Sequence, residues 1–223
     1  MTPRSPTLKT LQIDFVSDVA CPWCAVGLNA FEKGLQQVGP DVEVAVQFQP
    51  FELNPDMPAE GADTVAYLSA KYGIDETQIR ANQARIRDMG AAVGFTFGER
   101  TRVWNTFDAH RLLHWAGLVD EQKGKQRDLK HALLTAYHGQ GRNPGAHDVL
   151  QELAAGVGLP ADEAARILAS DAYAAEVRAA EREWQEAGIR SVPSVVINRR
   201  HLIQGAQSPE AFALALRRVA EAG

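Results

Sequence analysis

Two cysteines stand three positions apart in the chain, and there are no others. They form the sequence Cys21-Pro22-Trp23-Cys24, directly after an apolar run. A structural zinc site normally takes four Cys or His ligands, usually with a second cysteine pair. A structural disulfide that closes so short a loop removes little entropy from the unfolded chain. The pair is therefore predicted to do redox chemistry by opening and closing one disulfide.

A metal site is the alternative that the histidines offer. His110 and His114 are four positions apart, a spacing that can place two imidazoles on one helix face. No HExxH motif accompanies them, and nothing nearby completes a site. We expect no metal and no separate cofactor. The remaining histidines are interpreted as solvated or helix-end residues: His131, His138, His147 and His201.

Composition indicates a globular protein with one large domain or two small ones. The chain has 223 residues, of which 45% are hydrophobic and 23% charged, and its formal net charge is −5. An acidic chain without a basic cluster lacks the Lys and Arg that nucleic-acid phosphates require. No apolar stretch is long enough to cross a bilayer, and residues 1–10 are polar where a signal peptide would be apolar. We expect a cytoplasmic protein that binds neither nucleic acid nor membranes.

The predicted strand and helix around the cysteines place the two residues at different positions in the helix. Residues 11–16 alternate apolar and polar side chains as a strand does, and Pro22 suits the first turn of a helix. Leu28, Phe31 and Leu35 then mark one buried helix face, which Gly39-Pro40 terminates.

These positions predict a division of labour between the two thiols. Cys21 falls at the helix N-terminus, where free N–H groups and the helix dipole favour a thiolate. Cys24 lies one turn further in, covered by the helix. Cys21 is therefore the predicted nucleophile and Cys24 the predicted resolving thiol. A reducing compartment tolerates disulfides mainly when they are transient and catalytic, which agrees with this interpretation.

The rest of the pattern is strand, a long helical block, two strands and a helix. Residues 42–48 alternate as a strand, whereas most of the chain up to Gly188 has helical spacing, including residues 126–138, 147–156, 161–168 and 172–188. Strand character returns at residues 191–198 and 201–204, and a last helix starts at Ser208-Pro209. We expect a disordered tail (1–9), one discontinuous domain (10–58 and 189–223) and a helical insertion (59–188).

The chain resembles the DsbA-type oxidoreductases, specifically their FrnE-like cytoplasmic branch. The likeness covers nearly everything from Leu11 onward, and it is carried by residues 17–24, 51–55, 108–112 and 205–207 together with Val192-Pro193. It implies an α/β thioredoxin-like fold (βαβ…ββα) with a large all-helical insertion domain. It also implies that Pro193 is cis and faces the cysteines across a substrate groove, whose other residues are Pro22, Trp23 and Val192.

The expected activity is thiol–disulfide exchange through a mixed disulfide, in which protein disulfides are oxidised, reduced or isomerised. The expected partners are protein thiols and disulfides or small thiols, with glutathione as a candidate co-substrate. Two alternatives remain open. The first is a glutathione-dependent isomerase or transferase of the 2-hydroxychromene-2-carboxylate isomerase or kappa glutathione transferase type, which resembles this architecture but has serine at the position of Cys21. The second is a non-catalytic, redox-switched peptide-binding module.

Overall fold

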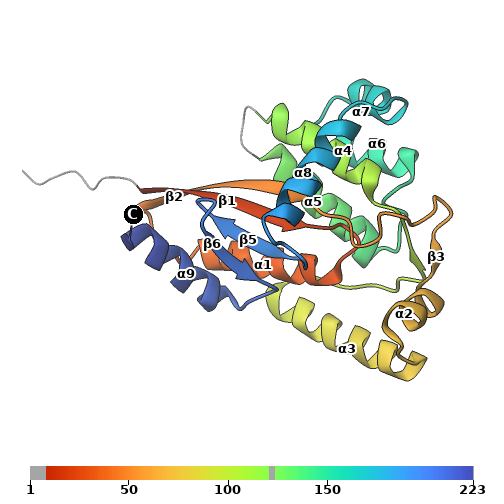
Figure 1. The fold of residues 1–223 in the computed structure, drawn as a ribbon, viewed down its shortest axis with the longest axis horizontal. Coiled ribbons are helices and arrows are strands. Elements are labelled where there is room, and N and C mark those ends of the chain that lie inside the picture. Colours follow the sequence, from red (N-terminus) through yellow and green to blue (C-terminus); the bar gives the residue numbers. More distant parts are fainter. Residues whose placement is uncertain (1–8, 121–123, 223) are drawn as a thin grey trace, which may run out of the picture.

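A four-stranded mixed sheet forms the centre of the computed structural model, which describes residues 9–120 and 124–222. The strand order is β2-β1-β5-β6, with β2 parallel to β1 and the other neighbours antiparallel. The strands are β1 (Lys9–Ser17), β2 (Val42–Pro50), β5 (Ser194–Ile197) and β6 (His201–Gln204). Helices α1 (Pro22–Leu35) and α9 (Pro209–Ala222) complete the expected βαβ…ββα order (Figure 1).

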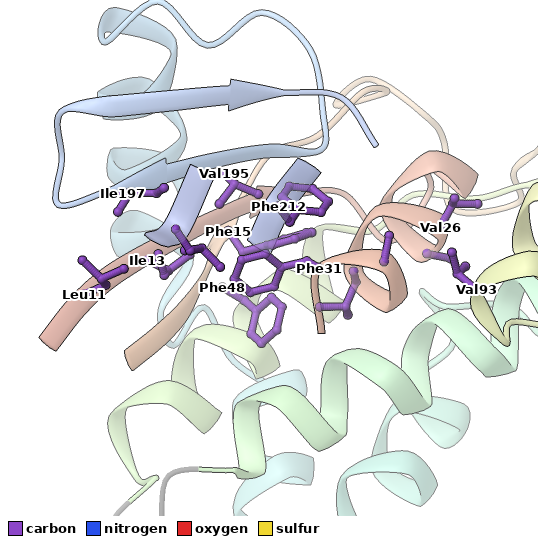
Figure 2. Close-up of a cluster of buried hydrophobic side chains, with 14 of the residues drawn as sticks. Leu11, Ile13, Phe15, Val26, Phe31, Phe48, Val93, Val195, Ile197 and Phe212 are labelled. Carbon is purple, nitrogen blue, oxygen red and sulfur yellow. The ribbon is translucent and has the colours of Figure 1, made fainter. Parts of the chain in front are cut away.

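Side-chain alternation along β1 explains how the sheet is covered. Leu11, Ile13 and Phe15 share a core with side chains of α1 and α9 (Figure 2). Val16, on the opposite face, packs in a second cluster with Trp184 of α8 (Ala174–Glu186). Because successive strand residues point to opposite faces, a single strand supports helices on both sides. Phe15 also contacts the rings of Phe31 and Phe48, with centroids 5.7 and 5.6 Å away.

The chain between β2 and β5 is mainly helical. Its helices are α2 (Thr64–Tyr72), α3 (Glu76–Val93), α4 (Phe107–Leu118), α5 (Lys125–Leu134), the π-helical turn η1 (Thr135–Gly139), α6 (His147–Gly156), α7 (Ala161–Leu168) and α8. Helices α4 to α8 gather beside the sheet, whereas α2 and α3 form a separate arm below it (Figure 1). None of the helices in the described residues is long and apolar enough to span a membrane.

Two short strands within this block were not predicted. β3 (Ala62–Asp63) pairs antiparallel with β4 (Arg102–Val103), so Trp104 directly follows a strand. Lys9, which we assigned to the tail, is the first residue of β1. The rest of the predicted tail, residues 1–8, lies outside the described residues.

The block packs tightly against the sheet domain. Val93, Phe95 and Leu134 belong to the same core as the β1 side chains. Glu32 on α1 is also paired with Arg127 and His131 on α5, at 2.5 and 2.9 Å. Burial alone would raise the pKa of Glu32, but its hydrogen bonds and charge interactions with these two partners lower it to about 2.

Candidate active site

Strand register brings three segments to one edge of the sheet. Ser17 at the end of β1 pairs with Pro50 at the end of the parallel strand β2, while Val16 pairs with Ser194 at the start of β5. The residues that follow β1, those that follow β2 and those that precede β5 therefore meet. These segments contain the two cysteines, the loop 51–54 and Val192-Pro193.

Cys21 occupies the position that the sequence predicts, as the N-cap of α1 in an extended conformation. Its side chain is nearly covered, with 4% of the residue exposed, and its thiol donates to the Val192 carbonyl at 3.5 Å. The peptide bond between Val192 and Pro193 is cis. Gly27 lets α1 approach this loop, because a Cβ atom there would lie 2.7 Å from Pro193 Cγ.

The two thiols have opposite pKa shifts. The pKa of Cys21 is lowered, chiefly by a hydrogen bond from the Cys24 thiol and also by the backbone N–H groups of Cys24 and Trp23; burial and the charge of Asp18 oppose this. The pKa of Cys24 is raised well above its usual value, first by burial and then by the interaction with Cys21. A thiolate is therefore favoured at Cys21 and disfavoured at Cys24.

A buried carboxylate lies directly behind the cysteine turn. Asp18 is fully covered and accepts hydrogen bonds from the Ala20 and Leu53 backbone N–H groups at 2.9 and 2.7 Å. The Thr106 hydroxyl donates to it at 2.8 Å, and His110 Nε2 lies 3.4 Å away. Burial would raise the pKa of Asp18, but the hydrogen bond and charge of His110, with the two backbone donors, lower it. His110 thus positions the cysteine turn through Asp18.

Lys130 on α5 is a buried cation near the thiols, and it was missed in the sequence. Only 1% of the residue is exposed, and the charges that act on it are those of Cys24, Asp18 and Cys21. Burial lowers its pKa, while these neighbours raise it. In return, the charge of Lys130 lowers the pKa of Cys24.

His138 was expected to be a solvated or helix-end residue, and it does lie in the last turn of η1. It is not solvated, however, because only 2% of the residue is exposed, and its Nε2 lies 2.8 Å from the Val19 carbonyl. Burial, assisted by the charges of Arg100 and Lys130, lowers its pKa to about 3. The π-helical turn η1 directs the ring toward the cysteine loop, and a helical pattern does not reveal such a turn.

Glu52, in the loop after β2, lies in a second buried acidic group. One of its carboxylate oxygens pairs with Arg178, which also binds Glu181, and each glutamate keeps one buried oxygen without a partner among the described residues. Burial, together with the charge of Glu181, raises the pKa of Glu52 to about 7, although His110 and Arg178 oppose the shift.

Two of the three predicted groove residues line a cavity beside Cys21. Pro22 and Trp23 line a cavity of about 340 Å³ together with Cys21 and side chains of α2 and α3. Val192 does not line this cavity; its carbonyl accepts a hydrogen bond from the Cys21 thiol. Among residues 9–120 and 124–222, no group of three or more Cys, His, Asp or Glu side chains could hold a metal ion.

A family model for the DSBA-like thioredoxin domain matches residues 12–217. The chain therefore belongs to the DsbA-like family of thioredoxin-fold disulfide oxidoreductases. This confirms the fold class and the family that we expected from the sequence.

Individual proteins of known structure agree with this membership. The crystal structure of the "probable DsbA oxidoreductase SCO1869" from Streptomyces coelicolor is 37% identical, with a TM-score of 0.85 over 95% of this chain and 90% of that one. Two structures below 25% identity share the fold alone. A 2-hydroxychromene-2-carboxylate isomerase is 13% identical (TM-score 0.72; 95% and 97% covered), and the cytosolic disulfide reductase DsbM from Pseudomonas aeruginosa, solved with GSH, is 17% identical (0.60; 95% and 98%).

Proposed function

We propose that this protein catalyses thiol–disulfide exchange, with Cys21 as the attacking thiol and Cys24 as the resolving thiol. The observation that carries the proposal is the asymmetry of the pair. Cys21, at the helix N-terminus, has a lowered pKa and lines a cavity, whereas Cys24 is fully buried and has a raised pKa. The thiolate is the reactive form of cysteine, so the two residues are suited to consecutive steps.

The reaction follows from this assignment. The Cys21 thiolate attacks one sulfur of a substrate disulfide, a bond forms between them, and the other substrate sulfur leaves as a thiolate. Cys24 then loses its proton and attacks Cys21, which releases the second substrate thiolate and leaves the Cys21–Cys24 disulfide. The substrate gains the two electrons that the protein loses. Two further thiols restore the reduced pair, and the reverse sequence oxidises a dithiol.

Two further assignments belong to this proposal. Val192 and Pro193 are assigned to substrate binding because they flank Cys21, and the Val192 carbonyl contacts its thiol. We assign glutathione as the candidate co-substrate. We also assign the protein to the cytoplasm and to the FrnE-like branch of the family. The structure of DsbM, described as a cytosolic disulfide reductase and solved with GSH, supports this pairing of fold and thiol.

Alkylation rates and trapping test the proposal together. Cys21 should react with iodoacetamide well below pH 8.5, the ordinary range of a free thiol, while Cys24 resists. The Cys24→Ser variant should accumulate mixed disulfides through Cys21. Equal labelling of both thiols at the rate of an ordinary exposed cysteine would contradict the assignment.

The isomerase alternative predicts a different result for the same variant. A glutathione-dependent isomerase has no use for a resolving thiol, so Cys24→Ser would keep full isomerisation activity. Disulfide exchange, measured by insulin reduction or by refolding of reduced ribonuclease, should instead be lost in this variant. A measured reduction potential, compared with about −220 to −260 mV for extracted cytosolic glutathione, then gives the direction of transfer.

A further inference from the structure

The cavity beside Cys21 has the size of a small-molecule site. Its volume is about 340 Å³, within the range of about 300–1,000 Å³ that is typical of ligand pockets. Its lining includes the cysteine turn and side chains of the α2–α3 arm. Cys21 is only 4% exposed, yet it is part of the lining, so a ligand inside the cavity lies next to the predicted nucleophile.

The arm supplies a mainly apolar part of the lining. Two of its lining residues are Ile79, which is 1% exposed, and Tyr72, which is 58% exposed. The other apolar side chains in this part of the lining are Tyr67, Leu68, Ile74 and Ile86. Aromatic and aliphatic walls of this kind bind an apolar ligand group, and flat rings in particular.

The charged residues of the lining all have the same sign. They are Lys71, Arg85 and Arg100, and the lining contains no Asp or Glu although the chain carries a net charge of −5. None of the ion pairs found within residues 9–120 and 124–222 involves these three side chains.

Two of these cations are held in place by neutral oxygens. Lys71 Nζ donates to the Leu53 carbonyl at 3.0 Å and to Asn54 Oδ1 at 2.6 Å. Arg100 donates to the Ala20 carbonyl at 3.2 Å. Neutral acceptors leave the positive charges uncompensated, so an anionic group of the ligand is the complementary partner.

We propose that this cavity binds small-molecule thiols and disulfides that combine an apolar, ring-containing body with a carboxylate. The inference rests on the proposed function and specifies its substrate class. The apolar body contacts the α2–α3 wall, the carboxylate faces the cations, and the sulfur lies at Cys21. The Cys21 thiolate attacks the bound disulfide, and Cys24 resolves the product. One disulfide thus becomes two thiols as the protein dithiol becomes a disulfide.

The test is the single-turnover oxidation of the reduced protein, followed by stopped-flow absorbance. The probes are dithiobis-nitrobenzoate, whose two aromatic rings each carry a carboxylate, and dithiodipyridine, which is aromatic and neutral. We expect the rate with dithiobis-nitrobenzoate to saturate with concentration. Arg85→Gln and Lys71→Met should each weaken its apparent binding about threefold to tenfold, while the rate with dithiodipyridine changes less than about twofold.

Arg87→Gln is the matched control. Arg87 is exposed on the same helix as Arg85, but it lines the neighbouring cavity and not the one beside Cys21. Its substitution should leave both probes unaffected. Leu68→Ala, which removes part of the apolar wall, should weaken the binding of both aromatic probes.

The possible failures are distinguishable. If Arg85→Gln and Arg87→Gln behave alike, or if the neutral probe loses as much as the acidic one, the substrate class is wrong while thiol–disulfide exchange stands. If the wild-type protein reacts with both probes no faster than Cys21→Ser, the proposed function itself is wrong.

Discussion

Cys21 and Cys24 are one helical turn apart and both are buried, yet their neighbours shift their pKa values in opposite directions. The pKa of Cys21 is lowered by its interactions with the Cys24 thiol and with the backbone N–H groups of Cys24 and Trp23. Cys24 is enclosed by apolar side chains, and the opposing cation that acts on it is Lys130. The buried lysine therefore offsets part of the cost of forming a thiolate at Cys24 when this residue must attack.

Lys130→Met should slow the resolving step. The substitution keeps the length of the side chain but removes the charge that lowers the Cys24 pKa, so less Cys24 thiolate forms at neutral pH. We expect the mixed disulfide at Cys21 to persist about threefold to tenfold longer, because a smaller thiolate fraction slows the attack and higher intrinsic nucleophilicity offsets only part of this loss. Rapid acid quenching and mass spectrometry of the mixed disulfide measure its lifetime.

The free energy of unfolding of Lys130→Met should increase or stay constant. Burying a charge is costly, so replacing Lys130 by an apolar side chain should not lower the free energy of unfolding. Lys125→Met on the same helix is the control, since Lys125 binds the Val157 carbonyl and does not act on the thiols. An unchanged mixed-disulfide lifetime in a folded Lys130→Met protein would remove Lys130 from the mechanism.

At this scale, residues that act through local spacing could be predicted, and residues that act through tertiary contacts could not. Cys21 and Pro22 sit at a recognisable helix start. Lys130, by contrast, looks like any lysine in an amphipathic helix, and His138 like a helix-end residue. Only the packing of α5 and η1 against the cysteine loop makes these two side chains buried and relevant.

Helix α1 is positioned by its close approach to the Pro193 loop. Gly27 is the residue that permits this approach, because any Cβ atom would come within 3.0 Å of the proline ring. This role could not be predicted from the sequence, because a glycine inside a helical pattern indicates only a slightly lower helix propensity. The same closeness holds Pro193 in its position relative to Cys21.

Gly27→Ala should therefore destabilise the protein. Alanine improves helix propensity by about 1 kcal/mol, but overpacking of a filled site costs about 1–3 kcal/mol, so the net loss is about 0–2 kcal/mol. Disulfide exchange should slow as well, because the Pro193 loop must move away from α1. Urea unfolding and insulin reduction measure the two effects.

Gly156 provides the matched comparison. It is the last residue of α6, and a Cβ atom there would meet nothing within 4 Å. Gly156→Ala should stabilise the protein by up to about 1 kcal/mol without changing exchange activity. If Gly27→Ala stabilises to the same degree, the contact with Pro193 does not constrain the helix.

Element prediction succeeded where turn residues bound a long periodic segment. α6 and α7 have the predicted bounds, as does β6, and Pro160 immediately precedes α7. The ladder of β3 and β4 could not be predicted, because two residues per strand provide no alternation to detect. The turn between β5 and β6 differed in detail: the first strand was expected to continue to residue 198, but β5 ends at Ile197, and Asn198 and Arg199 adopt positive φ.

At the scale of the whole molecule, the buried groups Glu52 and His138 have opposing effects on the pH dependence of stability. Glu52 has a pKa of about 7 in the folded protein against 4.5 ordinarily, so the stability it contributes is full below pH 4.5 and is lost toward pH 7. His138 has a folded pKa of about 3 against 6.5 ordinarily. Its contribution is full above pH 6.5 and is lost as the pH falls toward 3. Between pH 4.5 and 6.5, the two groups therefore change the free energy of unfolding with pH in opposite directions.

Single substitutions should separate these slopes. In Glu52→Gln, the free energy of unfolding should decrease as the pH falls from 6.5 to 4.5, because only the His138 effect remains. In His138→Gln it should increase over the same range. Each slope is at most about 1.4 kcal/mol per pH unit, the value for one proton, and solvent screening reduces it at Glu52. Denaturant unfolding at several pH values measures both.

An exposed carboxylate supplies the control for these measurements. Glu60 is exposed and belongs to neither buried group, so Glu60→Gln should show the same dependence of the free energy of unfolding on pH as the wild type. Parallel profiles for Glu52→Gln and His138→Gln would show that at least one of the two groups does not titrate as described.

The hydrogen bonds of Asp18 have a consequence for the engineering of this fold. Four groups among the described residues contact the Asp18 carboxylate. Two are side chains of the insertion, Thr106 just before α4 and His110 within it, and the other two are the backbone N–H groups of Ala20 and Leu53. Excising the insertion would leave an ionised carboxylate beneath the cysteine turn without half of its partners. The sheet domain and the helical insertion are therefore not interchangeable modules. An exchange of insertions between relatives must keep the side chains that contact Asp18.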